Sequence, residues 1–154
     1  MIGNDIVDLK QAAQDSNWKR QGYLDKLFTT EEQFLISSDI QPDIMVWLLW
    51  TMKESAYKIN SRESKLREFA PVRLICNNLI IRNNTATGNV CYNDKLYYTR
   101  SKIEDNYIHT IAATTTAQLD LIKIAVIKTT EHQIRIDNPS SVSHHGNYLA
   151  LVYA

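Results

Sequence analysis

The sequence predicts an α+β fold in which helices pack on a mostly antiparallel sheet. Helix signals gather in the first half of the chain, short β-branched and aromatic runs follow Pro71, and one apolar strand-like segment opens the chain. The 154 residues, 44% of them hydrophobic and 22% charged, have the size and composition of an ordinary globular domain. We therefore expect a single domain over residues 1–154.

The first two segments after the N-terminus differ in polarity. Residues 1–9 predict a strand, because apolar side chains dominate the segment and only Asp5 and Asp8 interrupt it. Residues 18–24 are more polar, and we expect a helix there.

Two helix starts are marked by capping signals. Thr29 with Glu32 has the spacing of a capping box, and Thr30 with Gln33 has the same spacing. A proline–aspartate pair opens the next helix, which we expect over residues 42–59.

The second half of the chain predicts strands. Its runs of β-branched and aromatic residues are bounded by Asn, Asp or Gly. We expect strands over residues 72–76, 79–82, 88–92, 95–101, 107–114, 121–128 and 148–153. A turn over residues 145–147 precedes the last strand.

Charge and cysteine usage exclude several functions. The chain has 17 basic and 17 acidic residues, whereas general nucleic-acid binding needs a cationic excess. Cys76 and Cys91 lack the spacing of a zinc site or a disulfide framework. No signal-peptide pattern and no stretch of membrane-spanning length is present, so we expect a cytoplasmic protein without a membrane partner.

The opening strand carries an aspartate in an unfavourable setting. Residues 3–8 read Gly-Asn-Asp-Ile-Val-Asp, and aspartate is a poor strand former. One interpretation is an edge strand with solvated acids. The other is that Asp5 is retained for its chemistry.

Two further segments carry candidate functional side chains. On the helix over residues 50–58, Glu54 and Lys58 share one face, and apolar neighbours predict partial burial of the carboxylate. The alternative there is a surface ion pair. Ser143 and His144 lie beside the turn before the last strand, where they could contact a phosphate or be ordinary surface residues.

In this order the segments resemble the 4′-phosphopantetheinyl transferase superfamily, whose members carry G-x-D-I-V/E, then F-T-x-x-E, then W-x-x-K-E-S/A-x-x-K, with an S-H-x-G turn. The matching residues here are 3–8, 28–32, 50–58 and 143–146. The C-terminal position of the S-H turn resembles the small, holo-acyl-carrier-protein synthase type. That type implies a homotrimer with active sites between subunits. Val7 departs from the large type, which often has a second acid there.

The resemblance implies a phosphopantetheinyl transferase of the holo-acyl-carrier-protein synthase type. A serine of an apo carrier protein attacks the β-phosphate of coenzyme A, and 3′,5′-ADP leaves. Asp5 and Glu54 would hold Mg²⁺, or Mn²⁺, and Lys58 would meet a phosphate oxygen. Ser143 and His144 would contact the nucleotide end of coenzyme A. Either Glu54 or a metal-bound water would take the serine proton.

Carrier proteins of the acyl or peptidyl kind are typically acidic, so basic residues near the N-terminus are candidates for docking. These are Lys10, Lys19, Arg20 and Lys26. The rival interpretation is a non-catalytic relative that binds coenzyme A or a carrier protein without transfer. The carrier itself, and its pathway in fatty-acid, polyketide or peptide synthesis, stay open.

Overall fold

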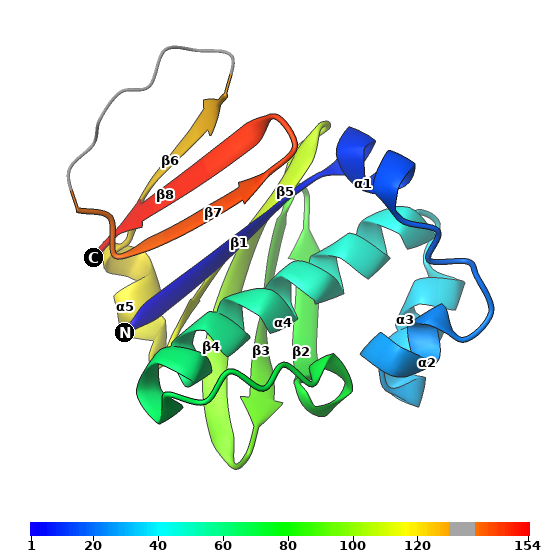
Figure 1. The fold of residues 1–154 in the computed structure, drawn as a ribbon, viewed down its shortest axis with the longest axis horizontal. Coiled ribbons are helices and arrows are strands. Elements are labelled where there is room, and N and C mark those ends of the chain that lie inside the picture. The colour runs from blue at the N-terminus through cyan, green and yellow to red at the C-terminus, as the bar shows by residue number, and fades with distance from the viewer. Residues whose placement is uncertain (130–137) are drawn as a thin grey trace.

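Helices and strands follow each other in the order that the sequence predicts, with strands concentrated in the second half. The computed structural model describes residues 1–129 and 138–154. Its elements are β1 (Ile2–Asp8), α1 (Leu9–Asp15), α2 (Tyr23–Leu27), α3 (Thr30–Ser38), α4 (Pro42–Ser64), β2 (Ile75–Arg82), β3 (Thr85–Tyr92), β4 (Lys95–Ile103), β5 (Tyr107–Ala113), α5 (Thr116–Leu121), β6 (Lys123–Lys128), β7 (Ser141–His145) and β8 (Tyr148–Tyr153) (Figure 1).

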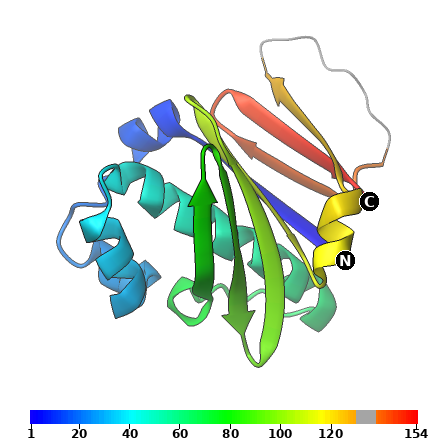
Figure 2. The ribbon, with the colours of Figure 1, turned by 180° about the vertical axis from the view of Figure 1, so that it is seen from behind.

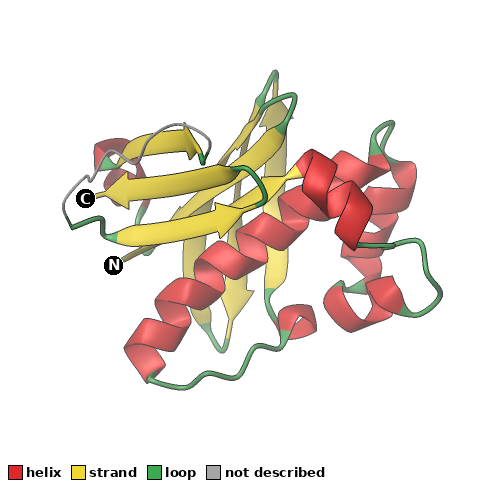
Figure 3. Cartoon of the chain, turned by 45° about the horizontal axis from the view of Figure 1, so that its top comes forward, coloured by secondary structure: helices red, strands yellow, loops and turns green. Residues whose placement is uncertain are grey.

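The strands form two antiparallel sheets. The larger has five strands in the order β1-β5-β4-β3-β2, and the smaller has three in the order β6-β8-β7. Helices α1 to α4 gather on one side of the sheets (Figure 3). The α+β fold class is therefore confirmed. Among the described residues, none of the helices combines the length and apolar character that crossing a membrane requires.

Helix α4 covers one face of the five-stranded sheet (Figure 1). Its residues Val46, Leu49, Met52, Ala56 and Ile59 are fully buried and recur at helical spacing, so they form one continuous apolar face. The same face packs on the inner residues of β3, β4 and β5. This packing fixes the rotation of α4 and therefore the direction in which its polar residues point.

Gly3 allows α4 to approach β1 closely. A Cβ atom at this position would overlap the carbonyl oxygen of Ser55 on α4, so only glycine permits this spacing. The close contact brings the polar residues of β1 and α4 together.

The smaller sheet docks on the open edge of β1. Because β5 pairs with only one edge of β1, the backbone N–H groups on the other edge need partners. The N–H of Ile6 donates to Ser143 Oγ at 3.1 Å, and the N–H of Asp8 donates to His145 Nδ1 at 2.9 Å. Side chains of β7 thus take the place of a neighbouring strand.

Some predicted boundaries are wrong. The predicted strands over 72–76 and 79–82 are one strand, β2, interrupted by an irregularity at Asn78, which has a left-handed φ of 53°. Residues Pro71–Arg73 form a short 3₁₀ turn instead. Trp18 to Arg20 lie in the turn between α1 and α2, although we expected a helix there.

Two elements were missed. Helix α5 precedes β6, and Thr115 caps it by accepting a hydrogen bond from the N–H of Gln118. The segment Ser141–His145 is a strand, and the turn after it is confined to Gly146 and Asn147. Helix α4 also continues beyond residue 59 to Ser64.

Candidate active site

A cleft of about 390 Å³ lies where β1, α1, α4 and β7 meet. It is lined by Asp5, Ile6, Val7, Ala12, Ser16, Tyr23, Trp47, Trp50, Glu54, His144 and His145. Residues from three of the predicted motifs therefore share one cleft, although they are up to 140 positions apart in the chain.

Asp5 lies on the side of β1 that faces α4, and it is largely buried. Its Oδ1 atom accepts a hydrogen bond from Lys58 Nζ at 3.1 Å and another from Ser143 Oγ at 2.9 Å. Within the described residues, Oδ2 of Asp5 accepts no hydrogen bond. Burial raises the pKa of Asp5, and the positive charge of Lys58 and the Ser143 hydrogen bond oppose the rise.

Glu54 projects from α4 into the same cleft, and it is partly buried as the sequence predicts. Burial raises the pKa of Glu54 to about 7, the negative charge of Asp5 adds to the rise, and Lys58 opposes it. Two acidic groups are thus held close together in a partly dehydrated site.

Lys58 contacts β1 rather than its helix neighbour. Its Nζ donates to the carbonyl oxygen of Asn4 at 2.7 Å and to Asp5. The alternative of a surface ion pair between Glu54 and Lys58 is wrong, because the ion pair of Lys58 among the described residues is with Asp5.

Ser143 and His144 lie on opposite faces of β7. The Ser143 hydroxyl donates to Asp5 and accepts from the N–H of Ile6, so it is engaged by β1. These bonds hold the Asp5 carboxylate against β7, and the expected contact of Ser143 with coenzyme A stays a prediction. His144 is exposed and lines the cleft of its own chain, so a neighbouring subunit is not needed to bring it near Asp5.

His145 is a site residue that the sequence analysis missed. Its Nδ1 accepts the N–H of Asp8, so a neutral ring carries its proton on Nε2. Gly146 follows with a φ of 53°, and a Cβ atom there would overlap the Asp8 carboxylate. The adjacency of two histidines before this glycine was the available signal.

Asp8 does not reach the cleft as an additional metal ligand. Its carboxylate accepts hydrogen bonds from the N–H of Gln11, which caps α1, and from the N–H of Asn147. Burial alone would raise the pKa of Asp8, but hydrogen bonds from backbone N–H groups outweigh it and lower the pKa. This carboxylate joins the start of α1 to the turn after β7.

Lys53, the residue before Glu54, is wholly enclosed. Its Nζ donates to Glu32 Oε2 at 2.7 Å and to the carbonyl oxygen of Pro71 at 2.8 Å. The predicted capping box is confirmed, because Thr29 and Glu32 exchange both of its hydrogen bonds. Glu32 also accepts the N–H of Cys76. Lys53 therefore fixes α4 against α3 and β2 instead of contacting a substrate.

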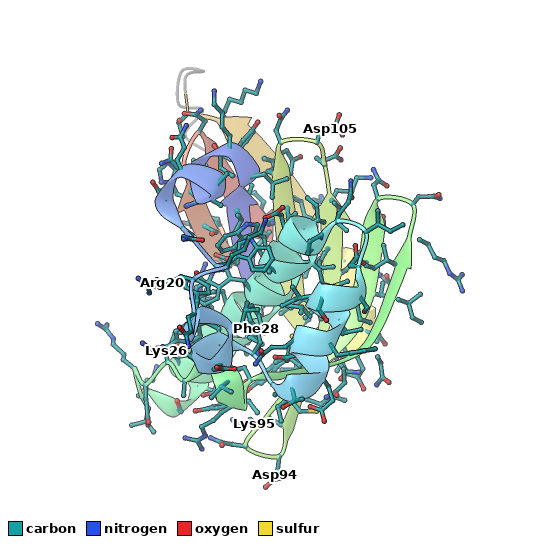
Figure 4. All side chains as sticks on the ribbon, turned by 90° about the vertical axis from the view of Figure 1, so that its right-hand side faces the viewer. Arg20, Lys26, Phe28, Asp94, Lys95 and Asp105 are labelled. Carbon is teal, nitrogen blue, oxygen red and sulfur yellow. The ribbon has the colours of Figure 1, made fainter. Side chains whose placement is uncertain are left out.

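The candidate docking residues are all exposed. Lys10 lies on α1, Lys19 and Arg20 lie in the turn, and Lys26 lies on α2. Figure 4 shows Arg20 and Lys26 on the surface at the helical end of the molecule. Ser16 and Tyr23, which lie near these basic residues in the sequence, line the cleft.

The cleft offers oxygen ligands to a metal ion. Among the described residues there is no group of three or more acidic, histidine or cysteine side chains arranged around a common point. Asp5 and Glu54 are the carboxylates of the cleft. This donor set fits Mg²⁺, which usually takes one or two protein carboxylates and completes its shell with water and substrate phosphates.

Comparison with known proteins identifies the family. The family model of the 4′-phosphopantetheinyl transferase superfamily matches residues 1–112, a segment that contains Asp5, Glu54 and Lys58 and ends before β7. No curated protein matches the sequence. Members of this family use coenzyme A and act with carrier proteins. Since the match spans more than half of the 154 residues, the chain belongs to the 4′-phosphopantetheinyl transferase superfamily.

Proposed function

We propose that this chain transfers the 4′-phosphopantetheine group of coenzyme A to a serine of an apo acyl or peptidyl carrier protein and releases 3′,5′-ADP. The observation that carries the proposal is the pairing of Asp5 and Glu54 in one cleft, where burial, and to a lesser extent the negative charge of Asp5, raise the pKa of Glu54 to about 7. Two neighbouring acids in a dehydrated site favour a bound cation.

Asp5 and Glu54 would hold the metal ion. Among the described residues, Lys58 and Ser143 both donate to Oδ1 of Asp5 and none donates to Oδ2, so Oδ2 is the available ligand. When bound, Mg²⁺ or Mn²⁺ would neutralise charge on the pyrophosphate of coenzyme A.

The other roles in the reaction are assigned to Lys58, Glu54 and two tryptophans. Lys58 supplies a positive charge beside the carboxylates, where charge grows on the leaving phosphate. Glu54, which projects into the cleft beside Asp5, is proposed to accept the proton of the serine hydroxyl. The indole rings of Trp47 and Trp50 line the cleft and limit access of water to it.

His144 is proposed to bind the nucleotide end of coenzyme A. It is exposed and lines the same cleft as Asp5 and Glu54, and it lies on the face of β7 opposite Ser143. Such a contact strengthens the ground state and the transition state alike, so His144→Ala should raise KM for coenzyme A and leave kcat nearly unchanged. A large fall in kcat with an unchanged KM would place this ring in the chemistry.

A homotrimer is proposed as the working assembly. Among the described residues, no lysine or arginine lines the cleft, whereas coenzyme A carries several phosphate charges. Cations of a neighbouring subunit would compensate for them. Light scattering on the purified protein tests this, and a monomer with full activity would contradict it.

The experiment that tests the function compares variants at the two carboxylates. Release of 3′,5′-ADP from coenzyme A is measured with an apo carrier protein and Mg²⁺ present. We expect Asp5→Ala and Glu54→Ala each to lose nearly all activity while staying folded, and a chelator to stop the wild-type reaction. Full activity in chelator would remove the metal from the proposal, and binding of coenzyme A without ADP release would favour a non-catalytic relative.

A further inference from the structure

A second cavity, of about 440 Å³, lies between the two sheets. Its floor includes His109 and Ile111 of β5, which pair with Ile6 and Asn4 of β1, on the sheet face opposite α4. Figure 2 shows this face, with the sheet β6-β8-β7 beside β5. The cavity shares no lining residue with the candidate active site.

The wall of this inter-sheet cavity on β6 is apolar and incompletely covered. Ile124 and Val126 pair with Val152 and Ala150, which are fully buried, so all four side chains lie on the inner face of the small sheet. Ile124 is nevertheless 48% exposed. An inner-face side chain normally packs against the facing sheet, so the described residues leave unfilled space beside β6.

His109 supplies a hydrogen-bond donor in the cavity. The ring is 2% exposed, and its Nε2 lies 3.1 Å from Asn4 Nδ2. Since an amide nitrogen can only donate, Nε2 accepts and a neutral ring carries its proton on Nδ1. Within residues 1–129 and 138–154, Nδ1 of His109 has no hydrogen-bond partner.

The charged groups at the cavity are compensated. Arg100 pairs with Asp120 at 2.6 Å and also donates to the carbonyl oxygen of Leu119, and Lys102 lies 3.8 Å from Glu104. Burial lowers the pKa of His109 to about 4, with a smaller contribution from the charge of Lys58, so the ring is neutral at pH 7. The cavity therefore offers apolar walls and a neutral donor, without an excess charge.

We propose that the inter-sheet cavity binds an uncharged, mainly apolar molecule whose carbonyl oxygen accepts the hydrogen bond of His109 Nδ1–H. The apolar part of the ligand covers Ile111, Ile124 and Val126. This inference does not depend on the proposed transfer reaction, because the cavity and the active-site cleft are separate.

The test uses 2-heptanone as the probe and heptanoate as the charged comparison. Methyl resonances of Ile111, Ile124 and Val126 are followed by NMR while each compound is titrated into the full-length protein. We expect saturable shifts with 2-heptanone and weaker binding of heptanoate. His109→Phe should weaken binding of 2-heptanone about fivefold, as the loss of one net hydrogen bond does.

The second part of the experiment uses a variant whose larger side chain fills the cavity. Ile124→Trp should abolish saturable binding, and Ile80→Trp, a β2 position of similar exposure (53% against 48%), should not change it. If Ile124→Trp fails to fold, Ile124→Met serves in its place and should weaken binding. Three results would each overturn the proposal: no saturable shift with the wild-type protein, equal binding to the filled variant, or a preference for heptanoate.

Discussion

Glu54 is a residue whose burial opposes stability. Its pKa is about 7 in the folded chain, against an ordinary value of 4.5. Between these values the folded state binds more protons than the unfolded state, so the free energy of unfolding falls as pH rises through this interval. The penalty is absent below about pH 4.5 and complete above about pH 7.

Glu54→Gln should therefore stabilise the metal-free protein. We expect the free energy of unfolding to rise by ~1–3 kcal/mol at pH 8 and to change little at pH 4.5, as urea titrations at the two pH values would show. Glu68→Gln, at an exposed position in the segment after α4, is the control and should change the free energy of unfolding by less than about 0.5 kcal/mol at either pH. Equal stability of wild type and Glu54→Gln at pH 8 would mean that Glu54 carries no such penalty.

Replacing Lys58 should change both turnover and stability, because Lys58 is the ion-pair partner of Asp5. Lys58→Met keeps the apolar stem but leaves the Asp5 carboxylate without its cation. We expect turnover to fall roughly a hundred- to a thousand-fold. We also expect the free energy of unfolding to fall by ~1–3 kcal/mol at pH 8. A variant that transfers the group at the wild-type rate would reduce Lys58 to a structural residue.

A variant of Ser143 distinguishes whether this side chain positions Asp5 or binds the substrate. Because its hydroxyl bonds Asp5 Oδ1 and the N–H of Ile6, Ser143→Ala should weaken Mg²⁺ binding and lower stability by ~1–3 kcal/mol. Val142→Ala, at the neighbouring and 45% exposed position, is the control. Calorimetric titration with Mg²⁺ checks the first effect. A raised KM for coenzyme A with unchanged Mg²⁺ affinity would return Ser143 to the substrate site.

At the scale of elements, α4 is held in place by an ion pair that is fully buried. Lys53 and Glu32 are 0% and 1% exposed, and their hydrogen bonds join α3, α4, Pro71 and β2. Removing one member of such a pair leaves an uncompensated charge in the interior. The Lys53–Glu32 ion pair therefore helps to fix the position of α4, the helix that carries Glu54 and Lys58.

Lys53→Met should therefore cost ~3–5 kcal/mol of unfolding free energy, measured by urea denaturation. Lys65→Met, at the exposed C-terminal end of α4, should change it by less than about 0.5 kcal/mol. The double variant Glu32→Gln/Lys53→Met should recover part of the loss, because no charge then remains buried. An equally unstable double variant would show that the ion pair is not the source.

The elements show what local sequence patterns can predict. The proline–aspartate pair at residues 42–43 predicted the start of α4, and the capping box predicted the start of α3, because each signal lies within one helix. Strand β7 was missed because its inward residues Ser141, Ser143 and His145 are polar. Ser143 and His145 accept backbone N–H groups on the edge of β1 instead of packing in an apolar core. Nothing in the local pattern distinguishes such a strand from a turn.

The candidate site likewise combines features that local patterns predicted with contacts that depend on packing. Motif spacing placed Glu54 and Lys58 on one face of a helix and left an ion pair between them as the alternative to a functional role. Lys58 instead pairs with Asp5, a contact over 53 positions that only the packing of α4 on β1 produces. The sequence therefore predicted which residues meet in the cleft, and the packing decides which atoms bond.

At the scale of the whole molecule, the site uses more of the chain than the family match covers. The match ends at residue 112, yet β7 supplies Ser143 and His144 from beyond it. The small sheet is thus joined to the Asp5 carboxylate and to the Ile6 backbone through the Ser143 hydroxyl. Changes in this sheet should affect the cleft directly.

The mass of an apo carrier protein after incubation shows directly whether this chain transfers the 4′-phosphopantetheine group. The carrier is incubated with this protein, coenzyme A and Mg²⁺, and a carrier whose acceptor serine is changed to alanine is the control. We expect a gain equal to one 4′-phosphopantetheine group on the intact carrier, no gain on the control, and no gain with Glu54→Ala. An unchanged mass across a panel of acyl and peptidyl carriers, with coenzyme A bound to the folded protein, would contradict it.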